Sequence, residues 1–162
     1  MDRASGLAAV HHGIAASHPS VAHINANDFS SLSEPAMVVF DTREPEEFAV
    51  SHIAGAIRVA PDLPPEAFLN EFGHLVEGKT AVFYCSVGAR SSQYAEQVQE
   101  ALRDSGAINV VNLERGLFGW HNDDRPLVQN SGAATRLIHP YDENWGRLVD
   151  RTEFLSYAPE IF

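Results

Sequence analysis

The stretch AVFYCSVGARSS, residues 81–92, contains the only cysteine of the chain and surrounds it with residues suited to chemistry. Cys85 ends an apolar run and is followed by a turn that carries Gly88 and Arg90. If the run is a strand and a helix begins near Ser91, the backbone N–H groups of the turn point at the sulfur and stabilise a thiolate. Glycine lets the turn close tightly, and the guanidinium adds a positive charge suited to an anionic substrate. We therefore expect Cys85 to be a nucleophile.

The competing interpretation of Cys85 is structural. A free cysteine is among the most buried residue types, and its position at the end of a strand alone favours a small apolar core residue. The glycine, the arginine and the two serines that follow favour chemistry instead. Because the chain has no second cysteine, an internal disulfide and a cysteine-rich zinc site are both excluded.

The composition suits one domain of ordinary size. The chain has 162 residues, 44% of them apolar, and a formal net charge of -11. Its arginines form no basic run, so we do not expect nucleic acid as a partner. No segment approaches the roughly 20 apolar residues of a membrane span, and the N-terminus lacks the apolar core of a signal peptide. We expect a cytoplasmic protein with no membrane partner.

Short apolar runs alternate with helix-like segments from about residue 22 onward. Five runs predict strands: 21–24, 36–42, 56–60, 80–85 and 108–113. Unbroken apolar runs are typical of parallel strands that are buried on both faces. The pattern therefore predicts an α/β fold with a central, mostly parallel five-stranded sheet flanked by helices on both faces. Ligands bind such sheets beyond the carboxyl ends of the strands, where Asp41 and Cys85 both fall.

The segments between these runs predict helices. Asn27 or Asp28 is expected to cap a brief helix, and Pro45 stands at the start of the next one. Further helices are expected at 64–75 and from Ser91 to Gly106, and residues 116–122 are expected to form a short aromatic helix or a turn.

The two ends of the chain lie outside this pattern. Residues 1–21 predict a helical or loose extension with three solvated histidines, and metal binding by these histidines is the weaker alternative. Residues 129–162 carry five of the fifteen aromatic residues, so disorder is not expected. Asp142 is expected to cap a helix whose apolar face carries Trp145, Leu148 and Val149. We expect this tail to dock on its own domain or on the second subunit of a homodimer, and the sequence does not separate the two.

Three motifs of this chain resemble those of a single-domain rhodanese, in the family's order and spacing. They are VVFDTREPEEFAVSHIAGAIRVAP, YCSVGARS and GLFGWHNDDRPL. Asp41 and Arg43 match the family's Asp-x-Arg, and His52 lies in its His-Ile-x-Gly-Ala turn. The resemblance covers residues 22–128 and implies a rhodanese-like domain with a three-layer α/β fold, between the extension at 1–21 and the tail.

The resemblance implies a sulfurtransferase, for which we expect no cofactor and no metal. Cys85 would take a sulfane sulfur from a donor such as thiosulfate and pass it, as a persulfide, to an acceptor such as cyanide or a thiol. The loop that follows would bind the outer sulfur and the donor: Ser86, Val87, Gly88, Ala89 and Arg90. Because no second thiol can resolve the persulfide, the sulfur must pass to a small molecule or to a protein acceptor.

Two alternatives remain open at this stage. An intact cysteine loop would also serve a sulfur carrier or regulatory module whose protein partner docks through the apolar tail. Dual-specificity phosphatases and some arsenate reductases resemble rhodaneses, but their Cys-x5-Arg loop is wide enough for phosphate or arsenate, and a histidine usually precedes the cysteine. Here the spacing from Cys85 to Arg90 is Cys-x4-Arg and the preceding residue is Tyr84, which favours sulfur.

Four further residues are expected to support the site. For Asp41 and Arg43, an ion pair that braces the loop is favoured over a catalytic role. His52 is expected to cap or brace its turn. Arg58 is expected in a surface salt bridge, with a place at the mouth of the pocket as the alternative.

Overall fold

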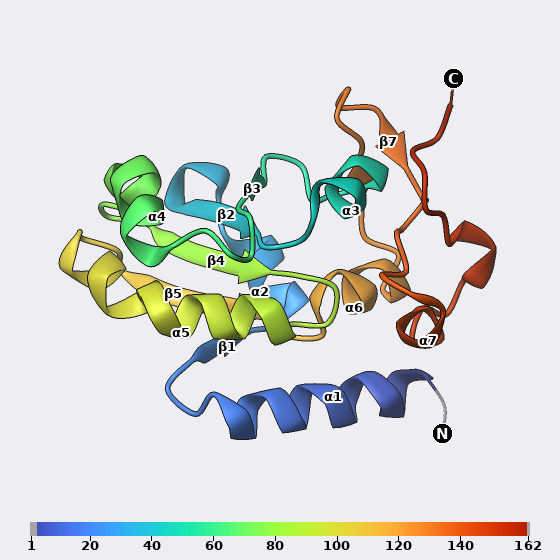
Figure 1. Cartoon of the computed structure of the whole chain (residues 1–162), viewed down its shortest axis with the longest axis horizontal. Coiled ribbons are helices and arrows are strands. Elements are labelled where there is room, and N and C mark those ends of the chain that lie inside the picture. The colour runs from blue at the N-terminus through green and yellow to red at the C-terminus, as the bar shows by residue number, and fades with distance from the viewer. Residues whose placement is uncertain (1–2, 162) are drawn as a thin grey trace.

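The main sheet is parallel throughout. The computed structural model of the chain describes residues 3–161 (Figure 1). Its main sheet consists of β1 (Ala22–Ile24), β2 (Met37–Asp41), β3 (Ile57–Arg58), β4 (Thr80–Tyr84) and β5 (Asn109–Leu113). Neighbouring strands pair in parallel in the order β1-β5-β4-β2-β3. The predicted five-stranded sheet is therefore confirmed, although β3 is shorter than the run at 56–60.

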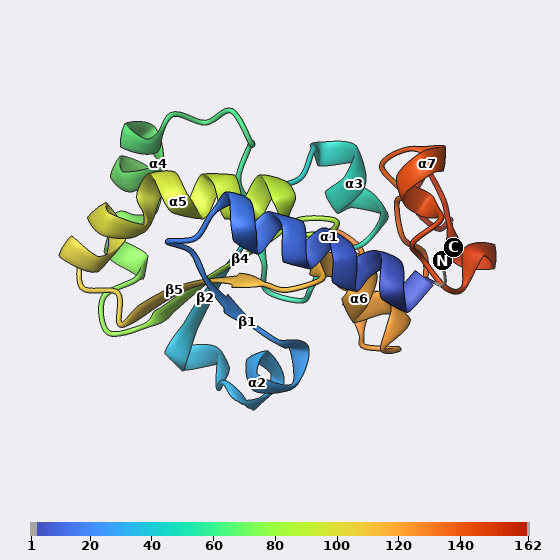
Figure 2. The ribbon, with the colours of Figure 1, turned by 90° about the horizontal axis from the view of Figure 1, so that it is seen from below.

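Helices cover both faces of this sheet (Figures 1 and 2). They are α1 (Arg3–Ser17), α2 (Ala26–Ser31), α3 (Pro45–Val50), α4 (Pro65–Phe72), α5 (Ala89–Asp104), α6 (Gly116–Asn122) and α7 (Glu143–Gly146). Single turns of 3-10 helix lie at Glu34–Ala36, Gly73–Leu75 and Thr152–Phe154, and an antiparallel ladder pairs β6 (Leu127–Val128) with β7 (Ala134–Thr135). The helix expected at 64–75 thus ends at Phe72 and tightens into a 3-10 turn.

The side chains of β4 alternate between two hydrophobic cores. Ala81 and Phe83 belong to one cluster with residues of α4 and α5, whereas Val82 and Tyr84 belong to another with residues of α2 and α6. All four are fully buried, as expected for the central strand of a parallel sheet. Because β4 lies in the middle of the strand order, Cys85 follows it at the centre of the carboxyl edge of the sheet.

Two helices begin earlier than predicted. Asn25, not Asn27 or Asp28, caps α2, because its side-chain oxygen accepts the backbone N–H of Asp28 at 2.8 Å. The two residues expected to cap the helix already lie within it. Helix α5 begins at Ala89, two residues before the expected start, because Gly88 adopts a φ of 106° and ends the preceding loop as the N-cap.

The N-terminal extension forms α1, which buries apolar side chains against the domain. His11 Nε2 lies 3.0 Å from Glu114 Oε2, and His18 Nδ1 lies 2.9 Å from Glu96 Oε2. The expectation of solvated histidines is therefore wrong for these two and holds only for His12, which is exposed. In the part of the chain that the structure describes, no group of three His, Cys, Asp or Glu side chains is arranged to hold a metal ion.

The tail at 129–162 packs against its own domain. Ile138 and Val149 are fully buried in the same cluster as the residues of α2 and α6. The tail also meets α1, since a Cβ on Gly6 would lie 2.7 Å from the Leu148 side chain, and Figures 1 and 2 show the N-terminal end of α1 beside α7. A homodimer through this tail stays a prediction.

Helix α7 is shorter than the tail's apolar pattern indicated. Asp142 caps it as predicted, and its carboxylate accepts the Trp145 N–H at 2.8 Å. The helix ends at Gly146, so Val149 lies beyond it and reaches the core from the chain that follows.

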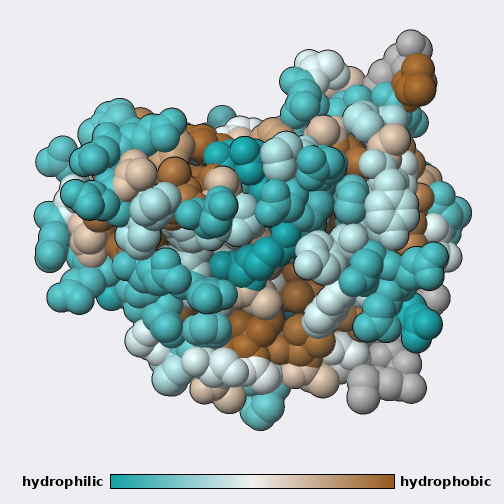
Figure 3. Space-filling model, in the orientation of Figure 1, coloured by the Kyte–Doolittle hydropathy of each residue, from teal (hydrophilic) through white to brown (hydrophobic). Residues whose placement is uncertain are grey.

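Hydrophilic side chains dominate the face of the molecule shown in Figure 3, in keeping with the net charge of -11. A smaller apolar area lies at the level of α1 on this face. Within residues 3–161, no helix combines the length and the apolar character that crossing a bilayer would require.

Candidate functional site

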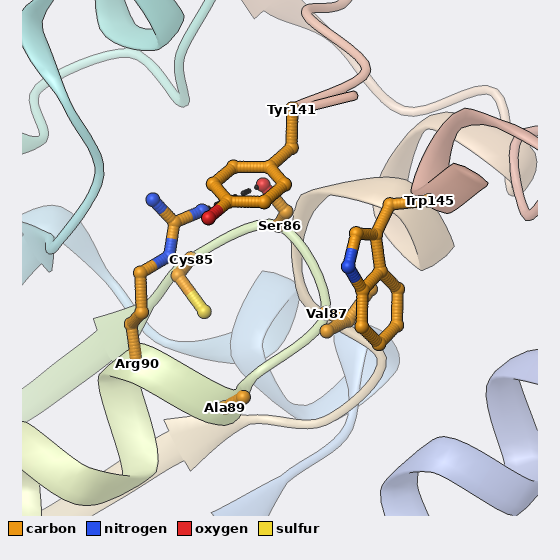
Figure 4. Close-up of a pocket in the computed structure, with 7 residues that line it drawn as sticks. All are labelled: Cys85, Ser86, Val87, Ala89, Arg90, Tyr141 and Trp145. Atoms are coloured by element: carbon orange, nitrogen blue, oxygen red, sulfur yellow. Dashed lines mark hydrogen bonds between the residues drawn. The ribbon is translucent and has the colours of Figure 1, made fainter. Parts of the chain in front are cut away.

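The sulfur of Cys85 lies inside the loop that leads from β4 into α5 (Figure 4). The residue is 1% exposed. The Gly88 N–H donates a hydrogen bond to Sγ over 3.2 Å, and the Ser91 hydroxyl oxygen lies 3.4 Å from Sγ. A Cβ on Gly88 would lie 3.2 Å from Asn112 Nδ2. The backbone angle favours glycine, a side chain there would press on Asn112, and the resulting turn directs an N–H at the sulfur.

The first turn of α6 forms backbone hydrogen bonds with this loop. The Leu117 N–H donates to the Cys85 carbonyl at 2.9 Å, and the Phe118 N–H donates to the Ser86 carbonyl at 3.0 Å. A Cβ on Gly116 would lie 2.5 Å from the Ser86 carbonyl oxygen. Only glycine lets the two backbones approach this closely, which explains why a glycine opens the GLFGW segment.

A buried carboxylate that was not identified from the sequence, Glu47, binds the loop arginine. Arg90 Nη1 donates to Glu47 Oε1 at 2.7 Å and Nη2 donates to Oε2 at 3.0 Å. The Ser86 hydroxyl donates to Glu47 Oε2 and accepts from Arg90 Nη2, both at 3.0 Å. Burial alone would raise the pKa of Glu47, but the hydrogen bonds and charge of Arg90, with the charge of Arg43, hold that pKa below its ordinary value. Glu47 is therefore ionised at neutral pH and cancels the charge of Arg90.

The sequence contained one signal for Glu47. The spacing Glu44-x-x-Glu47 is that of a capping box, and Glu47 Oε1 accepts the Glu44 N–H at 3.1 Å at the start of α3. The capping box predicts that Glu47 stabilises the start of a helix. It does not predict the contact between Glu47 and the loop that follows Cys85.

A cavity of about 150 Å³ opens over the cysteine loop (Figure 4). It is lined by Cys85, Ser86, Val87, Ala89, Arg90, Tyr141 and Trp145. The guanidinium carbon of Arg90 lies 4.9 Å from the centre of the Tyr141 ring, a cation–π contact. Tyr141 and Trp145 belong to the tail, and no sequence spacing connected them with the loop.

Asp41 and Arg43 form a fully buried ion pair near the site but outside this cavity. Arg43 donates to both carboxylate oxygens of Asp41, and its Nη2 also donates to the Ser51 carbonyl at 2.7 Å. The guanidinium carbon lies 5.8 Å from the centre of the Tyr84 ring, whose hydroxyl accepts the Ile53 N–H. The pair thus ties the segment between β2 and β3 to the end of β4.

His52 and Arg58 also lie outside the cavity. His52 Nδ1 lies 2.8 Å from the Phe48 carbonyl oxygen, and its backbone exchanges hydrogen bonds of 2.9 Å with Val128 in both directions. Burial lowers the pKa of His52, so the ring is neutral at pH 7. Arg58 Nη1 donates to the Arg43 carbonyl at 3.3 Å, where a surface salt bridge was expected. Both side chains brace the segment that carries the ion pair.

A chain of polar side chains leads from the sulfur to the N-terminal helix. The Ser91 hydroxyl oxygen lies 2.5 Å from Asn112 Oδ1, and Asn112 Nδ2 lies 3.1 Å from His23 Nδ1. The His23 ring meets the His11 ring edge to face, and His11 in turn pairs with Glu114. Burial, followed by the nearby His11, lowers the pKa of His23, so its ring is neutral and can accept the amide hydrogen. Helix α1 and β1 therefore help to place a hydroxyl beside the sulfur.

Comparison with known proteins gives a match to one family. The model of the rhodanese-like domain matches residues 25–123. An uncharacterised protein of Synechocystis sp. is 31% identical over 121 residues, which cover 72% of this chain and 60% of that protein. An arsenate reductase of Oryza sativa is 34% identical over 113 residues, which cover 66% of this chain and 86% of the reductase.

Two further matches bear on the same domain. A probable adenylyltransferase/sulfurtransferase of Mycobacterium tuberculosis is 30% identical over 93 residues, which cover 56% of this chain but only 21% of that protein. The solved structure of a rhodanese-related protein from Thermoplasma volcanium is similar with a TM-score of 0.50 and 30% identity, over 66% of this chain and 97% of that chain. The relatives thus include both a sulfurtransferase and an arsenate reductase.

Proposed function

This chain belongs to the rhodanese-like domain family, and from that membership and the surroundings of Cys85 we propose that it is a sulfurtransferase. The observation that carries the proposal is the environment of one thiol. Cys85 lines the cavity, is otherwise shielded from solvent, and its sulfur accepts the Gly88 N–H. Such a setting stabilises a thiolate and, after transfer, the anionic outer sulfur of a persulfide.

The proposed reaction has two half-reactions. The Cys85 thiolate attacks the outer sulfur of a donor such as thiosulfate. A new S–S bond forms, the S–S bond of the donor breaks, and sulfite leaves with the electron pair of that bond. Cyanide or a thiolate then attacks the outer sulfur of the persulfide, and Cys85 leaves as a thiolate. Neither step needs an external oxidant or reductant.

In this proposal the loop after the cysteine binds the transferred sulfur through its backbone. The residues are Ser86, Val87, Gly88, Ala89 and Arg90, of which all but Gly88 line the cavity. The Arg90 guanidinium, bound to Glu47 and Ser86, keeps the loop in shape and acts as a positioning residue. The four supporting residues act at a distance, through the segment between β2 and β3: Asp41, Arg43, His52 and Arg58.

Arsenate reduction is the second candidate, and the 34% identity to the Oryza sativa enzyme favours it. Two features of the loop weigh against it. The Cys-x4-Arg spacing is one residue short of the wider loop, and both terminal nitrogens of Arg90 already donate to Glu47. A tetrahedral oxyanion at Arg90 would have to compete with Glu47 for these nitrogens, so sulfur transfer fits the loop better.

A sulfur carrier that works with a protein partner is the third candidate. The Tyr141 side chain favours it, because this residue is 48% exposed and also lines the cavity. A docked protein can therefore touch the wall of the cavity directly.

One experiment separates the three candidates. The protein is incubated with thiosulfate, the mass of the Cys85 peptide is measured, and thiocyanate is followed after cyanide is added. We expect Cys85 to gain the mass of one sulfur atom and to lose it to cyanide, and we expect Cys85→Ser to do neither. If thiosulfate gives no such gain in mass but incubation with a protein sulfur donor does, the result would support the carrier instead. Cys85-dependent arsenate reduction without sulfur transfer would overturn the proposal.

A further inference from the structure

We propose that the cavity over Cys85 selects organic sulfur compounds that carry an apolar or aromatic group and at most one negative charge, in preference to the thiosulfate dianion. This inference rests on the proposed sulfurtransferase function and names the substrate class of the same site. Two independent features of the cavity carry it, its charge and its walls.

The charge of the cavity disfavours a dianion. Among the described residues that line it, Arg90 is the only basic one. Its two terminal nitrogens donate to Glu47, and the Glu47 side chain is 3% exposed, so the positive charge is cancelled at short range. With Cys85 as a thiolate, the net charge around the sulfur is negative. A doubly charged donor is repelled more strongly than a singly charged one.

The walls of the cavity favour an apolar group. Val87 lines it from the loop and Ala89 from the start of α5, and Tyr141 and Trp145 line it from the tail. Figure 4 shows the Trp145 ring beside Val87 and the Tyr141 ring over the guanidinium of Arg90. Both aromatic residues lie outside residues 25–123, the part of the chain that matches the family. The family's domain model therefore does not include the aromatic wall.

The backbone that carries this wall is held in place before any ligand binds. Tyr141 has a φ of 70°, and its N–H donates to Nδ1 of the buried His139 at 2.9 Å. The backbone N–H of Trp145 donates to the carboxylate of Asp142, the N-cap of α7. A Cβ on Gly146 would lie 2.9 Å from Pro140 Cβ, so α7 packs closely on the preceding chain. Because this backbone is already ordered, less of the contact energy with a ligand is lost to ordering the chain on binding.

A thiosulfonate anion has the required properties. In benzenethiosulfonate, the Cys85 thiolate attacks the terminal sulfur, the S–S bond breaks, and benzenesulfinate leaves with the electron pair. One negative charge enters as the donor and one leaves as the sulfinate, and the protein keeps one sulfur as the persulfide. Methanethiosulfonate reacts in the same way and also carries one negative charge, but it has no aromatic ring. Thiosulfate reacts in the same way as a dianion.

The test compares these three donors. The rate of persulfide formation on Cys85 is measured for each and divided by the rate at which the same donor reacts with free cysteine, which removes differences in intrinsic reactivity. For the native protein we expect the order benzenethiosulfonate, methanethiosulfonate, thiosulfate, with about tenfold between the first and the last. A higher corrected rate for thiosulfate would overturn the inference and leave the proposed function intact. Failure of all three donors to sulfurate Cys85 would remove the proposed function and the inference with it.

Variants of Trp145 test the wall itself. Trp145→Ala is expected to lower the corrected rate of benzenethiosulfonate about tenfold and that of thiosulfate less than about twofold. Trp145→Phe keeps an aromatic ring and should retain most of the preference for benzenethiosulfonate over thiosulfate. This variant therefore separates loss of the aromatic wall from loss of folding. Ile161→Ala is the control, because Ile161 belongs to the tail, is 95% exposed and does not line the cavity. The inference would be contradicted if Trp145→Ala lowered the corrected rates of all three donors equally, or if it left the preference for benzenethiosulfonate unchanged.

Discussion

At the scale of single residues, the carboxylate of Glu47 connects two parts of the structure. It accepts the Glu44 N–H at the start of α3, and it accepts hydrogen bonds from Arg90 and from the Ser86 hydroxyl. An arginine that was expected to meet an anionic substrate is thus already paired with a carboxylate. In the proposed function, this pair affects which donors the loop accepts as well as the cysteine does.

Replacing Glu47 with glutamine should destabilise the protein. Glu47→Gln keeps the shape but removes the charge that balances Arg90, which is three-quarters buried. We expect the free energy of unfolding in urea to fall by about 1–3 kcal/mol, less than for a fully buried pair because solvent screens part of the charge. Glu46→Gln changes an exposed residue of the same turn and should alter stability by less than about 0.5 kcal/mol. Equal effects of the two variants would refute this role.

The same carboxylate predicts a pH dependence. Because the pKa of Glu47 is lower in the folded protein than in the unfolded chain, its contribution is complete above the ordinary carboxyl pKa of about 4.3 and is lost as the pH falls through the folded value. The free energy of unfolding of the native protein should therefore decrease more steeply below about pH 4.3 than that of Glu47→Gln. Parallel pH curves for the two proteins would show that Glu47 has an ordinary pKa.

At the scale of elements, α6 acts as a support for the cysteine loop. Two N–H groups of its first turn hold the carbonyls of Cys85 and Ser86, and Gly116 removes the side chain that would separate them. The loop is therefore fixed from three sides, by β4, by the start of α5 and by the start of α6. A small shift of α6 is expected to move the sulfur without unfolding the domain.

Gly116→Ala tests this support. The added Cβ would lie 2.5 Å from the Ser86 carbonyl oxygen, which must move to make room. We expect the rate of sulfur transfer to fall about tenfold or more, while the circular dichroism spectrum keeps its native form. Gly132→Ala is the matched control, because Gly132 also has a positive φ, 85°, but no atom lies within 4 Å of its added Cβ. The interpretation would be wrong if both variants transferred sulfur at the native rate.

At the scale of the whole molecule, both ends of the chain extend the family's domain and meet each other. Helix α1 and the tail share one hydrophobic cluster, and Gly6 lies against Leu148. Through this packing, the tail that carries the aromatic wall is held by the N-terminal extension as well as by the domain. The extension therefore contributes to the site indirectly, by way of the tail and by way of His23 and Asn112.

Truncation of one buried tail residue tests whether the tail belongs to the same folding unit. Ile138 is fully buried, so Ile138→Ala should lower the free energy of unfolding by about 2–5 kcal/mol. Ile161→Ala, at a residue that is 95% exposed, should change it by less than about 0.5 kcal/mol. Because the packing lies within one chain, the unfolding midpoint should not depend on protein concentration. A midpoint that rises with concentration would show instead that a homodimer stabilises the tail.

Local patterns in the sequence were sufficient for most of the fold. The apolar runs predicted a mostly parallel five-stranded sheet, and Pro45 predicted the start of α3, because strand burial and helix starts depend on neighbouring residues. Where the prediction was wrong, the difference was small: the cap of α2 lies at Asn25, since several polar residues in a row compete for the same position. The loop after Cys85 could also be predicted from the sequence, because its five residues, 86–90, are consecutive.

The partners of that loop were decided by the tertiary structure alone. Glu47 lies in α3, Asn112 in β5 and Tyr141 in the tail before α7, and no local pattern relates them to Cys85 or Arg90. Each reaches the site only because parallel strands bring their carboxyl ends to one edge and the tail folds back over that edge. The sequence by itself therefore determined which atom reacts in the proposed chemistry. The charge and the walls around that atom arise from contacts between residues far apart in the chain, and these exist only once the chain has folded.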